Sequence, residues 1–251
     1  MFLDFYKSDV QATYLLWIVP LAFLLHLFLT RRGWRAADVS RHADSRFVRA
    51  YALVFAVETI LDSFATGPLA RWLGIAGTRA GTALMIAFVL IGDFRVLLLL
   101  QRLSRPALRP LQLAAESALW TLPVPLIAVV ADNVLQAAAG PWPEQSIWVV
   151  YELAFFLFAL FLRQVLLPDW LEATSGPRLA YLQAVTSYVA VYYALWAIAD
   201  VMILVLGLDL GWLVRVVPNQ LYYAFFVPFV YFRFFWSRDQ ASTSTSTHAS
   251  R

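Results

Sequence analysis

The stretch Phe47–Ala65 reads FVRAYALVFAVETILDSFA and is long and apolar enough to cross the hydrocarbon core of a bilayer. It nevertheless holds two acids, Glu58 and Asp62, in its second half. An ionisable group in hydrocarbon costs roughly 3 kcal/mol even on the lenient insertion scale. Because residues four apart lie on one face of a helix, the two acids predict a site inside a membrane-embedded bundle.

Six further stretches have the same character, so the sequence predicts seven transmembrane helices. The composition agrees, because 61% of the residues are hydrophobic and 14% are charged, against about 45–50% and about 25% in soluble proteins. We therefore expect an all-α polytopic membrane protein with one domain, residues 1–236, and a disordered cytoplasmic tail, residues 237–251. The other predicted spans are Ala12–Thr30, Thr82–Leu100, Leu111–Ala131, Ser146–Leu167, Leu179–Leu206 and Val217–Trp236.

The basic residues predict the orientation of these spans. Fourteen of the 19 Lys and Arg residues lie on the side of the first, third and fifth loops and the C-terminus. Because positively charged loops stay in the cytoplasm, the N-terminus is predicted to lie outside and the C-terminus inside, with the plasma (inner) membrane as the expected location. The four basic residues on the other side are Lys7, Arg71, Arg79 and Arg215.

Short matches between the two halves predict an internal repeat. Tyr51-Ala52-Leu53 lies seven residues before Glu58, and Tyr193-Ala194-Leu195 lies seven residues before Asp200. Two further matches, in the same chain order, join the first span to the fifth and the third to the seventh. This pattern is typical of two parallel three-helix units joined by the fourth span, a 3+1+3 plan that would bring Glu58 and Asp200 to a shared axis. Chance triplets in a Leu-, Ala- and Phe-rich sequence are the alternative.

Acids at a similar outer depth on several helices predict a polar cavity that opens outward. Structural hydrogen bonds are one alternative, and for Asp62 and Asp200 a position already in interfacial water is another. A buried carboxyl group without a partner can hold a proton near neutral pH. The predicted catalytic residues are Glu58, Asp62, Asp93 and Asp200.

Aromatic side chains near these acids predict a ligand-binding wall. They make up 16% of the chain and are concentrated in the last three spans. Ring faces attract apolar and cationic ligands, although interfacial or packing roles are the more common ones. The predicted substrate-binding residues are Trp148, Glu152, Tyr193, Trp196, Asn219 and Tyr223.

Arg95 is a basic residue inside a predicted span and needs a partner there. It lies about 200° around its helix from Asp93, so the two cannot share a face. Its partner is therefore expected on another helix, and Glu116, at a comparable cytoplasmic depth, is one candidate.

Several function classes are excluded or disfavoured. The only lysine, Lys7, precedes the first span, which excludes a retinal Schiff base within the bundle. The chain has no cysteine, no Walker loop and no GxGxxG motif. We expect no cofactor, no metal and no nucleic-acid partner. The expected partners are membrane lipids and an apolar or small-molecule ligand.

The layout resembles the small seven-helix membrane terpene cyclases of meroterpenoid pathways. The likeness rests on chain length, an acid on the second helix, and an aspartate on the third, here in Leu90-Ile91-Gly92-Asp93. The resemblance implies an enzyme that protonates an isoprenoid alkene or epoxide, and it maps the catalytic acid onto Glu58 or Asp62. The family's second key acid lies on the last helix, where this chain has none, so Asp200 would have to replace it.

Two other functions stay open at this point. Parallel three-helix repeats also resemble SWEET-type sugar transporters, in which case Glu58 and Asp200 would form a proton or substrate site between the halves. The family's Pro-Gln signature is missing, however, and Pro20 in the first span is matched by Glu152 rather than by a proline. The third hypothesis is a non-catalytic membrane subunit or sensor with structural carboxylates.

Overall fold

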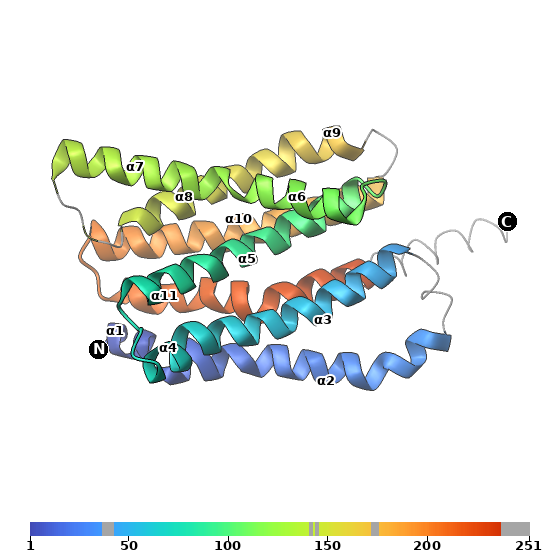
Figure 1. The fold of residues 1–251 in the computed structure, drawn as a ribbon, viewed down its shortest axis with the longest axis horizontal. Coiled ribbons are helices and arrows are strands. Elements are labelled where there is room, and N and C mark those ends of the chain that lie inside the picture. Colours follow the sequence, from blue (N-terminus) through green and yellow to red (C-terminus); the bar gives the residue numbers. More distant parts are fainter. Residues whose placement is uncertain (37–42, 141–142, 144–145, 172–175, 237–251) are drawn as a thin grey trace.

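The computed structural model describes residues 1–36, 43–140, 143, 146–171 and 176–236, and within these residues all regular secondary structure is helical. Seven long helical rods run side by side, and the described chain begins at one end of the bundle and finishes at the other (Figure 1). The predicted tail, residues 237–251, lies outside the described residues.

Five rods are long and apolar enough to cross a membrane, which confirms the all-α membrane class. They correspond to the predicted first, third, fourth, fifth and sixth spans. These rods consist of η1 (Val10–Tyr14) with α2 (Leu15–Ala36); α5 (Arg79–Ser104); α6 (Pro110–Thr121) with α7 (Pro123–Ala139); α8 (Ser146–Phe161) with η4 (Leu162–Leu166) and α9 (Leu167–Leu171); and α10 (Gly176–Leu204).

Two more rods lie at the predicted second and seventh spans. The first of these carries five charged residues within α3 and is correspondingly less apolar. Whether these two rods cross the membrane stays a prediction. They consist of α3 (Ala43–Phe64), η3 (Ala65–Leu69) and α4 (Ala70–Trp72), and of α11 (Leu210–Asn219), η6 (Gln220–Phe225) and helical residues 226–236.

Local sequence signals explain where several helices begin. The Thr78 hydroxyl accepts a hydrogen bond from the amide of Gly81 and caps α5. Pro110 and Pro123 lie in the first turns of α6 and α7, where the missing amide proton costs nothing. These signals fix the ends of the helices and so the depth at which each polar side chain lies.

The rods pack in a ring that follows chain order. α2 packs on α3, α3 on α5 and α5 on α6, while α7 packs on α8, α8 on α10 and α10 on α11. The contact between α2 and η6 closes the ring. A Cβ at Gly211 would lie 2.7 Å from the carbonyl oxygen of Ala199, so glycine permits the close approach of α11 to α10.

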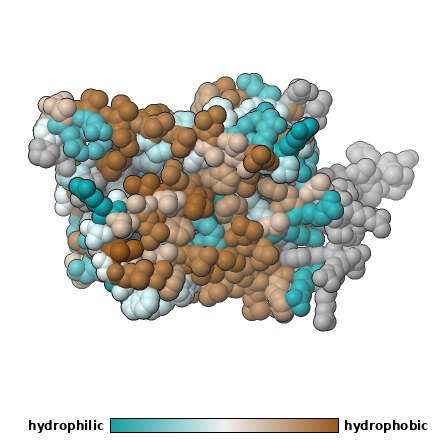
Figure 2. Space-filling model, viewed as in Figure 1, coloured by the Kyte–Doolittle hydropathy of each residue, from teal (hydrophilic) through white to brown (hydrophobic). Residues whose placement is uncertain are grey.

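Apolar side chains cover the outside of the bundle between its two ends. Ile18, Leu29, Leu126 and Leu157 are 60–67% exposed. On the face in Figure 2, apolar residues predominate across the middle and hydrophilic residues gather towards the two ends. Soluble monomers rarely expose so much continuous apolar surface, and lipid is its natural solvent.

In the described part of the chain four π-helical segments occur within the rods, and three of them have a proline inside or close by. Pro68 lies within η3, Pro218 lies two residues before η6, and Pro168 lies two residues after η4. Proline lacks the amide donor and collides with the preceding turn, so it disturbs the regular α-helical hydrogen bonding around it. Turns of the π-helical kind are frequent at functional sites.

Candidate functional site

A cavity of about 550 Å³ lies at the end of the bundle that holds the N-terminal helix α1 (Phe2–Lys7). This volume is within the roughly 300–1,000 Å³ range typical of small-molecule pockets. Eight of the lining side chains are aromatic. The lining residues are Tyr6, Lys7, Gln11, Ala12, Leu16, Asp62, Ser63, Thr66, Gly67, Arg71, Met85, Val89, Trp148, Tyr151, Glu152, Tyr193, Trp196, Trp212, Arg215, Asn219, Tyr222 and Tyr223.

Asp62 is a wall residue of this cavity and is only 2% exposed. Its carboxylate accepts a hydrogen bond from the Thr66 hydroxyl, with 3.3 Å between Oγ1 and Oδ1, and the Tyr223 hydroxyl lies beside it. Among the described residues, no cationic group lies within ion-pair distance of Asp62. Hydroxyl groups, rather than a salt bridge, therefore hold this acid.

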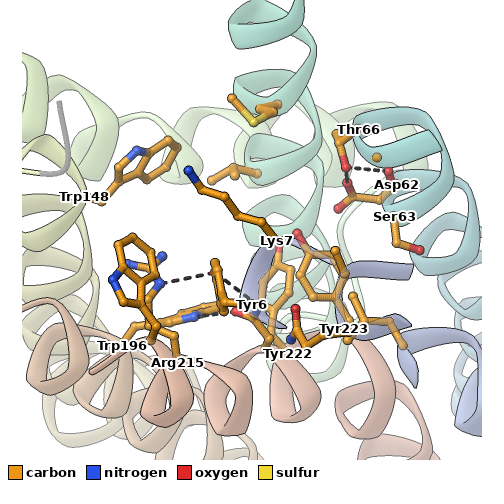
Figure 3. A pocket seen from close by; sticks show the side chains of 18 of the residues that line it. Tyr6, Lys7, Asp62, Ser63, Thr66, Trp148, Trp196, Arg215, Tyr222 and Tyr223 are labelled. Carbon is orange, nitrogen blue, oxygen red and sulfur yellow. Dashed lines mark hydrogen bonds between the residues drawn. The ribbon is translucent and has the colours of Figure 1, made fainter. Parts of the chain in front are cut away.

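Glu152 contributes a second wall carboxylate from α8 and is 4% exposed. Its Oε1 lies 3.7 Å from the guanidinium of Arg215. Figure 3 shows Asp62 on one side of the cavity and Trp148 with Arg215 on the other. The two wall acids therefore come from opposite sides of the bundle and flank the same aromatic-lined space.

Arg215 is the centre of a polar network that ties α1, α10 and α11 together. It donates hydrogen bonds to the buried Asp200 carboxylate and, from Nε, to the Tyr6 hydroxyl at 3.2 Å. Asn219 Nδ2 also donates to the Tyr6 hydroxyl, at 3.3 Å, and Asn219 Oδ1 accepts from Trp196 Nε1 at 2.7 Å. Asp200 is thus fully buried behind the wall and anchors Arg215, and it does not lie at a water-exposed surface of the protein.

Asp93 lies behind the wall and is 0% exposed. The hydroxyl groups of Tyr151 and Tyr193, which both line the cavity, donate to its two carboxylate oxygens. The aspartate therefore orients two phenol rings of the wall.

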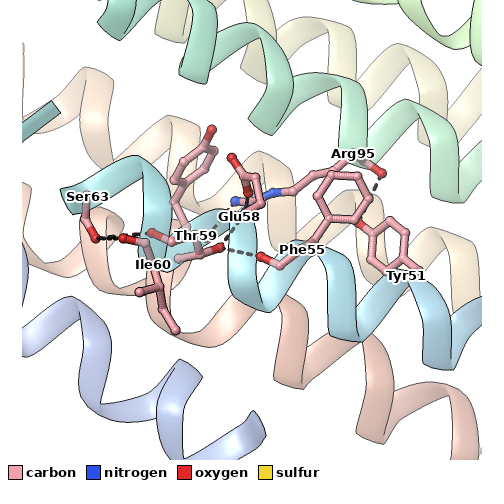
Figure 4. Close-up of polar contacts among 8 residues, drawn as sticks. Tyr51, Phe55, Glu58, Thr59, Ile60, Ser63 and Arg95 are labelled. Carbon is pink, nitrogen blue, oxygen red and sulfur yellow. Dashed lines mark hydrogen bonds and ion pairs between the residues drawn. The ribbon is translucent and has the colours of Figure 1, made fainter. Parts of the chain in front are cut away.

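Glu58 is bonded to Arg95 beneath the cavity, as Figure 4 shows. Arg95 is 1% exposed, and its Nη1 lies 3.3 Å from Glu58 Oε2 and 3.0 Å from Thr59 Oγ1. Its Nη2 donates to the carbonyl oxygen of Tyr222 at 2.8 Å, and the guanidinium lies over the Tyr222 ring, 4.4 Å from the centroid. One arginine therefore links α3, α5 and η6.

The suggestion that Glu116 pairs with Arg95 is wrong. Glu116 is bonded to Arg105, from the loop that precedes its own helix. Arg95 instead points towards the cavity end of α5, where Glu58 is within reach, because long side chains of a helix point towards its N-terminus.

Seven of the ten predicted site residues line this same cavity, and the other three lie behind its wall. Glu58 and Asp200 are held by different arginines, Arg95 and Arg215, so the described contacts do not pair them at a shared axis. The seven that line the cavity are Asp62, Trp148, Glu152, Tyr193, Trp196, Asn219 and Tyr223.

Sequence reasoning missed several wall residues, most of which lie outside the predicted spans. Lys7 precedes the first span in sequence but lines the cavity, between the two walls in Figure 3. Arg215 was used only to predict the orientation in the membrane, and Gln11 and Tyr222 were not predicted as site residues. A usable signal was present in Pro68 and Pro218, because each lies in or next to a π segment that borders the cavity.

Below the cavity, towards the opposite end of the bundle, the core is closely packed. Leu97, Leu100, Leu182, Val185 and Phe226 are all 0% exposed and belong to one hydrophobic core cluster. The cavity described here is lined only by residues at the α1 end of the bundle.

Comparison with known proteins found no family model, no curated protein and no solved structure that matches this chain. The fold and composition define an all-α membrane protein, and its function has to be inferred from the cavity.

Proposed function

We propose that the protein is a membrane-embedded enzyme that uses a carboxylic acid to protonate and cyclise an isoprenoid or related lipid. The observation that carries this proposal is Asp62, a buried acid with no described cationic partner, which lines the same aromatic-rich cavity as Glu152. An acid held by hydroxyl groups can carry a proton, and a positioned carboxylic acid is a competent proton donor.

The chemistry assigns a role to each wall. Asp62 delivers its proton to one carbon of a substrate alkene, and the π-electron pair forms the new C–H bond and leaves a cation on the neighbouring carbon. A second alkene of the same molecule attacks that cation and closes a ring. Aromatic faces such as those of Trp148 and Trp196 stabilise the positive charge. Loss of a proton to the Glu152 carboxylate regenerates an alkene, so the net reaction is an isomerisation.

The proposal includes seven spans with the N-terminus outside. The charge asymmetry of the loops supports this orientation. The cavity would then lie in the outer half of the membrane. After each reaction Asp62 could regain a proton from water, and Glu152 could release its proton to water, near the exposed Lys7. A ligand of this kind is membrane-soluble, and lipids are the expected surroundings.

A proton-coupled transporter is the second candidate, and the geometry favours it less. Glu58 and Asp200, the acids which that hypothesis requires, are bonded to arginines and do not line the cavity. A non-catalytic subunit or sensor is a third candidate, and no particular contact favours it.

The test is turnover of linear isoprenoid alcohols, epoxides and prenylated phenols by the purified protein in deuterated water. Acid-catalysed cyclisation transfers a solvent-derived deuteron to a product carbon, which mass spectrometry detects. We expect the Asp62→Asn variant to lose this activity by about 100-fold or more, the usual contribution of a general acid.

The matched control is Asp169→Asn, the same change at an exposed aspartate of α9 that does not line the cavity. It should retain wild-type turnover. Wild-type activity of Asp62→Asn would refute the assignment of the acid. No deuterium in any product of the wild-type protein would argue against the enzyme altogether.

A further inference from the structure

Three basic side chains line the cavity, and acids of the same chain pair with two of them. Arg71 is bonded to Asp9, and Arg215 is bonded to Asp200. Lys7, the third, makes no ion pair with any residue that the structure describes. The described part of the cavity wall therefore presents one positive charge that no acid of the protein compensates.

The position of Lys7 is fixed through its chain neighbour Tyr6. The Tyr6 hydroxyl accepts hydrogen bonds from Arg215 Nε at 3.2 Å and from Asn219 Nδ2 at 3.3 Å. Its ring lies 5.3 Å from that of Trp212, between centroids. These contacts hold α1 against α11. Because Lys7 is exposed and also lines the cavity, it marks the side on which the cavity opens to solvent.

The character of the cavity changes from this opening to its interior. Lys7 is exposed, whereas the wall acids Asp62 and Glu152 are only 2% and 4% exposed. Aromatic rings supply apolar surface between them, and Trp148 and Tyr223 lie on either side of Lys7 in Figure 3. A ligand that matches this order has an anionic head at Lys7 and an apolar body among the rings, so its charge stays away from the buried acids.

A single lysine fits a head group with one negative charge. Its ammonium group is a compact point charge, whereas planar bidentate recognition of phosphate is typical of arginine. The two arginines of the wall, Arg71 and Arg215, are already bonded to acids of the chain. A carboxylate carries one negative charge at neutral pH, so it is the head group that this opening matches best.

We infer that Lys7 is a substrate-binding residue and that the substrate class is an isoprenoid carboxylic acid, whose carboxylate it binds at the opening of the cavity. This inference rests on the proposed function for the isoprenoid part of the ligand. The anionic head group rests on the uncompensated charge of Lys7 and on its place at the opening.

The test is equilibrium binding of two probes that share a carbon skeleton, farnesoic acid and the neutral alcohol farnesol. Binding to the full chain in uncharged detergent micelles, at mildly alkaline pH and low ionic strength, is followed through the fluorescence of Trp148, Trp196 and Trp212, which line the cavity. We expect the wild-type protein to bind farnesoate about fivefold more tightly than farnesol, as an ion pair at an exposed site allows. Added salt should reduce this preference because it screens exposed charges.

Three variants isolate the role of Lys7. Lys7→Gln should lose the preference for farnesoate and keep farnesol binding, and Lys7→Arg should retain the preference. The matched control is Arg79→Gln, which removes the same charge from an exposed residue at the start of α5 that does not line the cavity. It should bind both probes as the wild type does. Comparison of variants also cancels the different partitioning of the two probes into micelles.

Two results would overturn the inference. One is a wild-type protein that binds farnesoate no more tightly than farnesol, a comparison that needs no variant. The other is a Lys7→Gln protein with the wild-type preference. An equal loss of preference in Arg79→Gln would also count against Lys7, because the overall charge of this end of the bundle would then attract the anion.

Anionic phospholipid in the micelles distinguishes a bilayer head group from a free carboxylic acid as the source of the anion. We expect phosphatidylglycerol to displace farnesoate no better than phosphatidylcholine does. Stronger displacement by phosphatidylglycerol that disappears in Lys7→Gln would overturn the assignment of a carboxylic acid. Failure of the enzyme proposal would look different, because farnesoate would then bind in a Lys7-dependent way and yet no deuterium would enter it.

Discussion

Arg95 Nη1 lies 3.3 Å from Glu58 Oε2, and this ion pair joins α5 to α3 beneath the cavity with the arginine 1% exposed. Removal of one partner of a buried pair leaves an uncompensated charge and costs roughly 3–5 kcal/mol. We therefore expect Arg95→Met to lower the free energy of unfolding by that amount in a denaturant titration in micelles. The double variant Arg95→Met with Glu58→Met should recover most of the loss.

The exposed pair of Arg71 and Asp9 provides the comparison for this prediction. Its side chains are 44% and 50% exposed, and such pairs contribute only about 0–1 kcal/mol. Asp9→Asn should therefore leave the unfolding transition almost unchanged. An equally small effect of Arg95→Met would show that the buried pair does not stabilise the junction.

The carboxylate of Asp93 is predicted to depend on two phenols for its position. Tyr151→Phe and Tyr193→Phe should each destabilise the protein by roughly 1.5–3 kcal/mol, the usual worth of a hydrogen bond to a charged group. Tyr192→Phe is the matched control, because Tyr192 is equally buried and its hydroxyl has no described partner. Thermal unfolding monitored by tryptophan fluorescence should show a lower melting temperature for Tyr151→Phe and Tyr193→Phe than for Tyr192→Phe. A loss of stability in Tyr192→Phe as large as in the other two would contradict the role of the two hydrogen bonds to Asp93.

Gly92 is predicted to tolerate substitution poorly because a larger side chain would overlap Tyr222. A Cβ there would overlap the Tyr222 hydroxyl oxygen and lie 2.6 Å from Cζ, so the ring would have to move. Gly92→Ala should cost about 1–3 kcal/mol of folding free energy, as overpacking usually does. Gly176→Ala, where a Cβ meets nothing within 4 Å, should leave the stability unchanged. Normal stability of Gly92→Ala in thermal unfolding would show that Tyr222 is free to move.

The orientation can be measured directly, since the chain has no cysteine. Ala76 and Ala107 are exposed in the loops that precede and follow α5, so they report the two ends of one rod. In intact cells, a membrane-impermeant maleimide should label Ala76→Cys, and it should label Ala107→Cys only after permeabilisation. The reverse pattern would invert the predicted orientation, and equal labelling of both in intact cells would argue against a crossing by α5.

The sequence located the rods well because hydrophobic length is a local property. The predicted fifth span begins at Ser146, where α8 begins, and the predicted sixth span lies within a few residues of α10. It also identified Asp62 and Glu152, since an acid inside an apolar run is conspicuous. It could not choose between Glu58 and Asp62, which lie one turn apart, because the choice depends on Arg95 from another helix.

The wall residues outside the predicted spans show the other limit of sequence reasoning. Gln11 and Lys7 line the cavity because the N-terminal segment lies over the end of the bundle. Arg215 appears in sequence as one more loop arginine, and only the fold brings it to Asp200 and Glu152. Helical spacing relates residues along one helix and carries no information about which helices meet.

The sequence alone determined that the chain is helical and suited to a membrane, and it showed that acids and aromatics are embedded in its apolar stretches. These follow from composition and from the length of apolar runs, and each residue contributes to them independently of distant ones. The tertiary structure alone decided which acids face the cavity and which are bonded to arginines, because the partner of a buried charge is set by the packing of helices far apart in the chain.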